Sequence, residues 1–243
     1  MARNEIAATD ELWESAERWL PTFSPEEQRA GITLLRELAN GERVTIAQFA
    51  RALGTTLDTA NALVKDSVLC PFVHRDDADR IQGFWGLSVA PTRHQLAING
   101  HTLWTWCAED SLFIPELLGA TAEIESRDPE TDQSIRLTVS PARVEAAKPV
   151  GIVVSMGRPE TWDVTSAPRI IATACHYIHF FASRHAGERW QVKHPEPETV
   201  LLSLDEAIGY GKRTNARLFG TELARCGQRP GALGVAAGPV AHS

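Results

Sequence analysis

The sequence lacks an excess of positive charge. Its 243 residues carry 24 Lys and Arg against 31 Asp and Glu, a formal net charge of −7 at pH 7, so there is no general electrostatic attraction to nucleic acid or to an anionic membrane. No apolar run approaches the roughly 20 residues of a membrane-spanning helix. Residues 1–10 also lack the apolar core of a signal peptide. We therefore expect a cytoplasmic protein that binds neither nucleic acid nor membranes.

Paired cysteine motifs and nucleotide-binding loops are also missing. The four cysteines, Cys70, Cys107, Cys175 and Cys226, form no Cys-x-x-Cys pair, which excludes a zinc ribbon and a thioredoxin-type motif. In a reducing cytoplasm we expect them to be free thiols. The chain contains no glycine-rich phosphate loop and no dinucleotide fingerprint, so the sequence predicts no bound cofactor.

What the chain does contain is an ordinary globular composition, with 43% hydrophobic and 23% charged residues. Helical signals come first. Apolar residues recur at helical spacing up to Leu20, and Ser24-Pro25-Glu26-Glu27 has the N-cap, proline and glutamate pattern of a helix start. The next predicted elements are helices at 45–54 and 57–65 and strands at 72–74 and 83–89. This order is typical of a winged helix-turn-helix.

The second helix of this motif, residues 57–65, argues against DNA binding. It offers one cation, Lys65, and one acid, Asp58, whereas phosphate contacts require clustered Lys or Arg. We therefore interpret the winged-helix-like part as a structural cap on the rest of the chain.

The second half of the chain mixes strand and helix signals. Asn99-Gly100 is typical of a hairpin turn. Ile170–Ser183 is rich in β-branched and aromatic residues and predicts a buried strand, with Cys175 and His179 on one face and His176 on the other. The remaining predictions are a hairpin of strands 121–126 and 135–139, a strand at 151–156, a loop at 157–168, a helix opened by Ser203–Glu206, and a disordered tail at 226–243.

Cys107 and Asp110 stand three residues apart in the aromatic run Leu103–Leu112. If this run is helical, both side chains lie on one face, and a carboxylate beside a thiol can take or return its proton. The alternative is that Cys107 and Cys175 are core cysteines, since a free cysteine often behaves as a small buried hydrophobe. The residue types alone leave both interpretations open.

Taken together, four blocks of the sequence resemble the organomercurial (alkylmercury) lyases of bacterial mercury resistance. The blocks are Leu103–Leu112 with Pro115 and Leu117–Gly119, Leu137–Pro141, Cys175 with Ile178–Ser183, and Leu204–Gly209. The likeness extends from about residue 30 to 220 and is weak in the N-terminal helices. It implies an α+β fold in which a helical, winged-helix-like N-terminal part precedes an α+β catalytic part of short strands and helices. We accordingly predict domains at residues 1–90 and 91–225.

The resemblance also implies the chemistry. The family's two cysteines and one aspartate fall on Cys107, Cys175 and Asp110, which would bind mercury as substrate and product. The reaction implied is protonolysis of the carbon–mercury bond, giving a hydrocarbon and Hg(II), with an external thiol for turnover. The implied partners are organomercurial small molecules, and low-molecular-weight thiols or a mercuric reductase that take up Hg(II).

The sequence departs from the family pattern at two positions. His176 stands where members often have a second cysteine, and the segment 127–133 lacks a cysteine found in some members. His176 and His179 are weaker candidate ligands, because imidazole competes poorly with thiolate for a soft cation. The other hypotheses are a thiol-based metal-sensing DNA-binding regulator and a thiol oxidoreductase that pairs Cys107 with Cys175.

Overall fold

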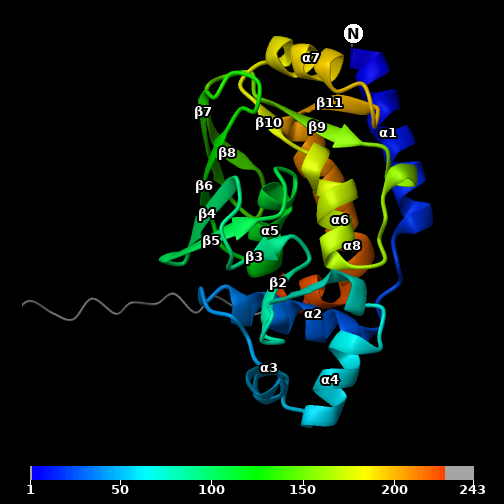
Figure 1. Cartoon of the computed structure of the whole chain (residues 1–243), viewed down its shortest axis with the longest axis vertical. Helices are drawn as coiled ribbons and strands as arrows, with labels where there is room; N and C mark the ends of the chain where they lie inside the picture. Colours follow the sequence, from blue (N-terminus) through cyan, green and yellow to red (C-terminus); the bar gives the residue numbers. More distant parts are fainter. Residues whose placement is uncertain (1, 228–243) are drawn as a thin grey trace, which may run out of the picture.

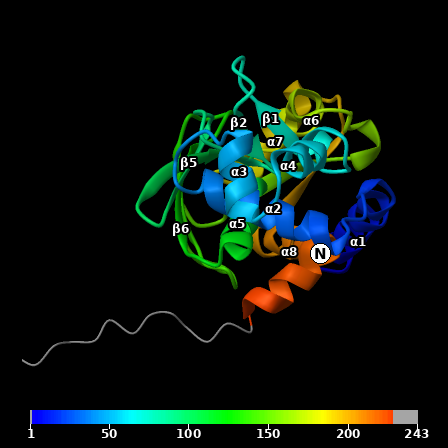
Figure 2. The same ribbon diagram turned by 90° about the horizontal axis from the view of Figure 1, so that it is seen from below.

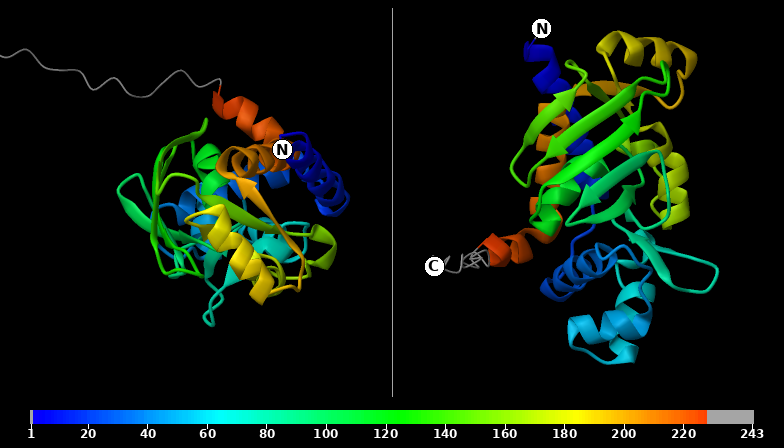
Figure 3. Two further views of the ribbon diagram at one scale, coloured as in Figure 1. Left: turned by 90° about the horizontal axis from the view of Figure 1, so that it is seen from above. Right: turned by 90° about the vertical axis from the view of Figure 1, so that its left-hand side faces the viewer.

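Eight antiparallel strands form the main sheet, in the order β1-β2-β3-β5-β4-β6-β7-β8. The right-hand view of Figure 3 faces this sheet. The computed structural model describes residues 2–227, so residues 228–243 of the predicted tail lie outside the described residues. The strands are β1 Val73–Arg75, β2 Ile81–Phe84, β3 Leu87–Ser88, β4 His94–Ile98, β5 His101–Thr105, β6 Ala122–Arg127, β7 Ser134–Val139 and β8 Val144–Lys148.

A second, three-stranded sheet has the order β10-β9-β11 and is also antiparallel. Its strands are β9 Val153–Gly157, β10 Phe180–Phe181 and β11 Thr199–Ser203. The central strand β9 is buried at every position, as expected for a strand covered on both faces.

Helices cover the inner side of the main sheet. Figures 1 and 2 show α5 between this sheet and α8, with α1 on the side of α8 away from the sheet. The helices are α1 Ala2–Trp19, α2 Pro25–Leu38, α3 Ile46–Leu53, α4 Leu57–Lys65, α5 Asp110–Leu118, α6 Ala167–Thr173, α7 Arg184–Lys193 and α8 Leu204–Gly227. The predicted α+β class is confirmed. Within residues 2–227, no helix is both long enough and apolar enough to span a membrane.

The helix starts predicted from side-chain caps are confirmed. The Ser24 hydroxyl accepts the Glu27 backbone N–H, and the Glu27 carboxylate accepts the Ser24 N–H. Ser203 and Glu206 make the same reciprocal pair at the start of α8. Each pair satisfies two backbone donors that the first turn of a helix leaves free. The helix-turn-helix and its wing are present as α3, α4, β1 and β2.

The hairpin predictions are also confirmed, whereas the strand predicted at 83–89 is two strands. Asn99 and Gly100 turn between β4 and β5 with φ values of 52° and 82°, the left-handed pair of a type I′ turn. In the 83–89 segment, Trp85 and Gly86 have φ values of 47° and 87° and reverse the chain between β2 and β3. The sequence pattern indicated the β content but not this turn.

The single strand predicted for Ile170–Ser183 is wrong. The segment begins within α6, continues as a 3₁₀ turn at Cys175–Tyr177 and ends in the short β10. Pro168 stands in the first turn of α6, a position that favours a helix start, and the packing of the helix overrides the β-branched composition. The predicted alternation of Cys175 and His179 against His176 therefore does not exist.

The main sheet continues across the domain boundary predicted at residue 90. β3 pairs with β5 through Leu87 opposite Thr105 and Ser88 opposite Trp104. The division into two domains stays a prediction, but the link between β3 and β5 places the turn at Gly86 against the segment that carries Cys107.

Candidate active site

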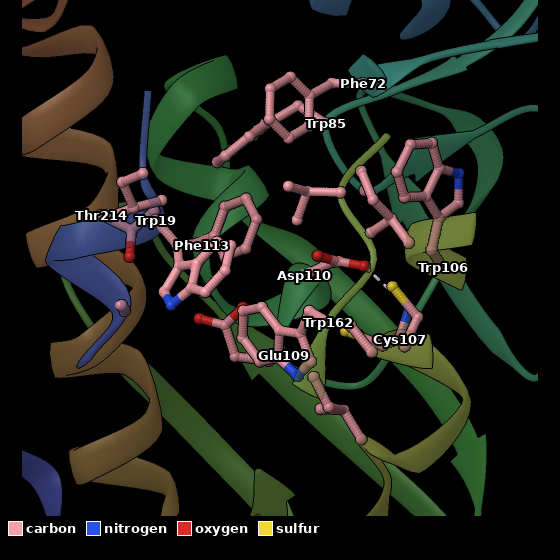
Figure 4. Close-up of a pocket in the computed structure, with 18 of the residues that line it drawn as sticks. Trp19, Phe72, Trp85, Trp106, Cys107, Glu109, Asp110, Phe113, Trp162 and Thr214 are labelled. Atoms are coloured by element: carbon pink, nitrogen blue, oxygen red, sulfur yellow. Dashed lines mark hydrogen bonds between the residues drawn. The ribbon is translucent and has the colours of Figure 1, made fainter. Parts of the chain in front are cut away.

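Cys107 lies in the turn between β5 and α5. The helix predicted to contain Cys107 begins only at Asp110, so the two side chains do not meet as positions i and i+3 of a helix. Instead, the Cys107 backbone N–H donates to Asp110 Oδ2 at 2.8 Å. The carboxylate closes the turn and comes to lie beside the thiol, as Figure 4 shows.

Two further hydrogen bonds fix this turn. The Thr105 hydroxyl donates to the Cys107 carbonyl oxygen at 2.8 Å, and the Trp106 backbone N–H donates to the Gly86 carbonyl oxygen at 2.8 Å. Thr105 is fully buried. The position of the Cys107 thiol is therefore set by buried backbone contacts rather than by a flexible loop.

Gly86 packs directly against the Asp110 side chain. A Cβ atom placed on Gly86 would lie 2.4 Å from Asp110 Cγ and 2.5 Å from Oδ1, closer than any real Cβ contact. The backbone at Gly86 also has a φ of 87°, which side-chain-bearing residues rarely adopt. The turn between β2 and β3 thus packs against the carboxylate and restricts its position.

We expect Gly86→Ala to displace Asp110 and lower turnover, because the new methyl group and the carboxylate cannot occupy the same space. The matched control is Gly100→Ala, where φ is 82° but nothing lies within 4 Å of the added Cβ. That control should lose only about 1–2 kcal/mol of stability for its backbone and keep its turnover. Turnover and urea unfolding of both variants test this. Equal turnover in the two would contradict the role given to Gly86.

Cys175 is held by the short sheet on the opposite side of the site. The Ile178 N–H donates to the Cys175 carbonyl oxygen at 3.1 Å. The buried Ser155 hydroxyl of β9 donates to the Tyr177 carbonyl oxygen at 2.7 Å and accepts the His179 N–H at 2.9 Å. Ser155, which the sequence analysis did not single out, thus anchors the loop that carries Cys175.

The two cysteine segments meet through one backbone hydrogen bond. The Ala108 N–H donates to the Ile178 carbonyl oxygen at 3.3 Å. One ligand atom from each of Cys107, Asp110 and Cys175 then lies within 4.8 Å of the others. Among the described residues, this is the one group of three or more His, Cys, Asp or Glu side chains that lie close enough together to hold a metal ion. It contains neither His176 nor His179.

A cavity of about 120 Å³ opens onto this cluster. Its walls are mostly aromatic and aliphatic, and Figure 4 shows Cys107 and Asp110 facing each other at one end. Trp19 of α1, which also lines the cavity, is about half exposed to solvent. The lining residues with aromatic rings are Trp19, Phe72, Trp85, Trp106, Phe113, Trp162 and Tyr210.

Burial controls the proton affinities at the cluster. Desolvation raises the pKa of Asp110 to about 6, although hydrogen bonds from the Cys107 side chain and backbone oppose the shift. Desolvation also raises the pKa of Cys107 well above its ordinary value, with further contributions from Cys175 and Asp110. For Cys175, the hydrogen bond with Cys107 lowers the pKa, but burial and the nearby carboxylates outweigh it. At neutral pH, both thiols keep their protons and Asp110 is the available acceptor.

Glu109 is a second buried carboxyl group that the sequence analysis did not select. Its side chain lines the same cavity, and its Oε1 atom is buried without a hydrogen-bond partner. Desolvation, followed by the charge of Asp110, raises the pKa of Glu109 well above its usual range. Its position next to Asp110 in an apolar run was the one sequence signal for it.

The geometry brings together two soft sulfur ligands and a proton-carrying oxygen. Thiolates prefer soft metal ions, and the carboxyl group can accept a proton from a thiol or deliver one to a bound ligand. Cys70 is half-buried in a 3₁₀ turn and lies outside the cluster. The side chain of Cys226 is outside the described part of the structure.

A family model and two relatives with similar sequences carry the same description, alkylmercury lyase. The sequence model of the alkylmercury lyases matches residues 87–215. The alkylmercury lyase of Streptomyces lividans is 38% identical over 79% of this chain and 85% of that protein. The alkylmercury lyase of Staphylococcus epidermidis is 33% identical over 76% of this chain and 80% of that protein.

A solved structure agrees with these relatives. The crystal structure of the mercury-bound form of MerB2 superposes with a TM-score of 0.68 and 25% identity, covering 84% of this chain and 95% of that one. The resemblance seen in the sequence blocks is therefore confirmed across most of the chain. From the family match and the identities of its relatives, we conclude that this chain is an enzyme belonging to the alkylmercury lyase family.

Proposed function

We propose that this enzyme cleaves the carbon–mercury bond of organomercurials by protonolysis, R–Hg⁺ + H⁺ → R–H + Hg²⁺. The observation that carries the proposal is the meeting of Cys107, Asp110 and Cys175 within 4.8 Å at one end of an apolar cavity. The two thiolates can bind the metal, the carboxyl group can carry the proton, and the apolar walls can contact the organic group.

The first step is capture of the organomercurial. One thiol sulfur binds mercury and gives its proton to Asp110, which is the acceptor because its pKa of about 6 leaves it ionised at neutral pH. Burial makes the thiolate form costly without such an acceptor. The carboxylate is already hydrogen-bonded within the Cys107 turn, so the transfer requires little movement.

The second step breaks the bond. The other thiol also binds mercury and loses its proton to water, after which both sulfurs donate electron density to mercury and weaken its bond to carbon. The bonding electron pair leaves with carbon and takes the proton that Asp110 holds. Mercury stays in the Hg(II) state throughout, so no oxidant or reductant is consumed, and Asp110 acts first as base and then as acid.

Turnover requires removal of Hg(II) from the two cysteines. We propose that low-molecular-weight thiols or a mercuric reductase take it up by thiolate exchange, in a cytoplasm that keeps Cys107 and Cys175 reduced. The alternative function, a metal-sensing DNA-binding regulator, has less support. The one cation of the would-be recognition helix, Lys65, forms an ion pair with Asp79, and the relatives are enzymes.

We expect the rate of capture to be nearly level between pH 8 and about 6 and to fall about tenfold per pH unit below that, because protonated Asp110 cannot accept the thiol proton. Asp110→Asn should instead show a rate that still rises at pH 8, since capture then depends on free thiolate. Quenching of tryptophan fluorescence by phenylmercury in a stopped-flow instrument measures both profiles. Identical profiles would contradict the transfer to Asp110.

The direct test of the function is incubation with phenylmercury and excess thiol, with benzene and ionic mercury as the expected products. We further expect enzyme dialysed against EDTA to keep its rate, because the proposed steps need only the two thiols and the carboxyl group. A strict requirement for added zinc or nucleotide would contradict this part of the proposal.

A further inference from the structure

A second cavity of about 400 Å³ lies on another side of Cys175. Cys175 and Trp106 line both this cavity and the apolar one, so both residues stand in the wall between the two cavities. The second cavity has a different set of walls: Arg93, His94, Pro129, Ile171, His176, Tyr177, His179, Trp190 and His194. We call it the histidine cavity.

The lining of the histidine cavity favours an anion. Its cation is Arg93, its four histidines offer ring nitrogens for hydrogen bonds, and among the described residues that line it there is no aspartate or glutamate. Glu130, next to the lining residue Pro129, is already paired with Arg189 at 3.2 Å and Lys193 at 2.7 Å. The apolar cavity, by contrast, contains the carboxyl groups of Glu109 and Asp110. An anion approaching Cys175 therefore meets the positive charge of Arg93 in the histidine cavity and the negative charge of Asp110 in the apolar cavity.

Two of the histidines provide neutral polar groups. Desolvation, followed by the charge of His179, lowers the pKa of His94 to about 3. Desolvation, followed by the charge of Arg93, lowers the pKa of His179 to about 4. The Nδ1 atom of His179 is buried and makes no hydrogen bond with the described residues.

Packing holds these walls in place. Trp190 stacks on His194 with ring centroids 4.5 Å apart and meets the edge of His179 at 5.3 Å. The Ser126 hydroxyl and His94 Nδ1 are 2.9 Å apart in a buried hydrogen bond. The cavity is thus bounded by packed side chains from β4, α6, the 3₁₀ turn Cys175–Tyr177 and α7.

We propose that the histidine cavity binds an anionic low-molecular-weight thiol, one that carries a carboxylate, and brings its sulfur to the Hg(II) held by Cys175. This inference rests on the proposed function, because it concerns the removal of that product. The hydrocarbon occupies the apolar cavity, whereas the thiol reaches the metal from the other side. The organic product therefore does not have to leave before the exchange begins.

The exchange step balances without redox chemistry. The incoming thiolate forms a new sulfur–mercury bond, the Cys175–mercury bond breaks, and the proton of the incoming thiol ends on the released Cys175 sulfur. A second thiol repeats the exchange at Cys107 and frees Hg(II) as its dithiolate. Mercury and all sulfur atoms keep their oxidation states, and the external thiol is the only co-reactant.

The test compares mercaptoacetate, 2-mercaptoethanol and cysteamine, which are anionic, neutral and cationic thiols, in steady-state turnover of phenylmercury. We expect Arg93→Gln to raise the half-saturating concentration of mercaptoacetate about two- to fivefold, the range for one solvent-screened ion pair, and to leave that of 2-mercaptoethanol unchanged. Arg93→Glu should raise the half-saturating concentration of mercaptoacetate further and lower that of cysteamine. The ratio of variant to wild type for each thiol cancels the intrinsic reactivities of the thiols.

The control is Arg51→Gln, because Arg51 is an exposed residue of α3 outside the cavity. This variant should leave the half-saturating concentrations of all three thiols unchanged. Equal shifts for all three thiols in the Arg93 variants, or no shift, would overturn the proposal. A separate readout is the benzene released in the first turnover without added thiol. Its absence in the wild type would refute the proposed function itself. Its presence without thiol selectivity would refute only the role of the histidine cavity.

Discussion

We expect Cys107→Ser and Cys175→Ser each to lower the turnover of phenylmercury by at least about 10³-fold, since loss of a residue that bonds to the reacting group commonly lowers the rate by more than this. Serine keeps the size and the hydrogen-bonding capacity of cysteine but offers a hard oxygen with little affinity for a soft metal. Both sulfurs belong to the buried cluster with Asp110, so neither can be replaced by a neighbour. Benzene release with excess thiol measures the effect.

Cys70→Ser is the matched control for these two variants. Cys70 is half-buried and lies outside the cluster, so its replacement by serine should keep most of the turnover. If either Cys107→Ser or Cys175→Ser retained near-normal turnover, the assignment of both sulfurs to mercury would be wrong. Loss of turnover in Cys70→Ser as well would indicate a general sensitivity to thiol removal.

Asp110→Asn should separate binding from cleavage. An amide keeps the shape of the carboxylate and can still accept the Cys107 N–H through its oxygen, but it cannot carry a proton at neutral pH. General acid–base groups contribute about 10²–10⁴ in rate, so single-turnover release of benzene should fall by at least about 10²-fold. A mercury titration of the variant should still reach the stoichiometry of the wild type.

Glu116→Gln provides the control for Asp110→Asn. Glu116 is on the same helix, α5, and its carboxylate accepts a hydrogen bond from Asn215 at 2.7 Å, which a glutamine oxygen can also accept. It lies outside the cavity, so cleavage should continue at the normal rate. An Asp110→Asn variant that binds and cleaves like the wild type would remove Asp110 from the mechanism. One that fails to bind would make Asp110 a ligand or a structural residue.

Local signals in the sequence were sufficient for much of the fold. Ser24 with Glu27, and Ser203 with Glu206, mark helix starts because their side chains satisfy backbone donors within the same turn. Asn99-Gly100 marks its hairpin because both residues tolerate positive φ. These features depend on neighbours in the chain, and no tertiary contact overrides them.

The geometry of the site depends on contacts between distant segments and could not be predicted from local sequence signals. Cys107, Asp110 and Cys175 were identified as candidates through the family resemblance, but the helix expected to join the first two and the strand expected to carry the third are both absent. Their true positions depend on Gly86 and Ser155, which act through contacts across the chain. Glu109 carried no signal beyond its neighbours, because its burial depends on α8, where Gly211 lies against it.

The measurement that tests the central claim most directly is the isotopic composition of benzene formed from phenylmercury and excess thiol in D₂O. Protonolysis through Asp110 takes the new hydrogen from an exchangeable site, so each benzene should carry one deuterium, and Hg(II) should be recovered in equal amount as its thiolate. Mass spectrometry of the trapped benzene gives the answer. Unlabelled benzene, biphenyl, or phenylmercury recovered intact would contradict the account.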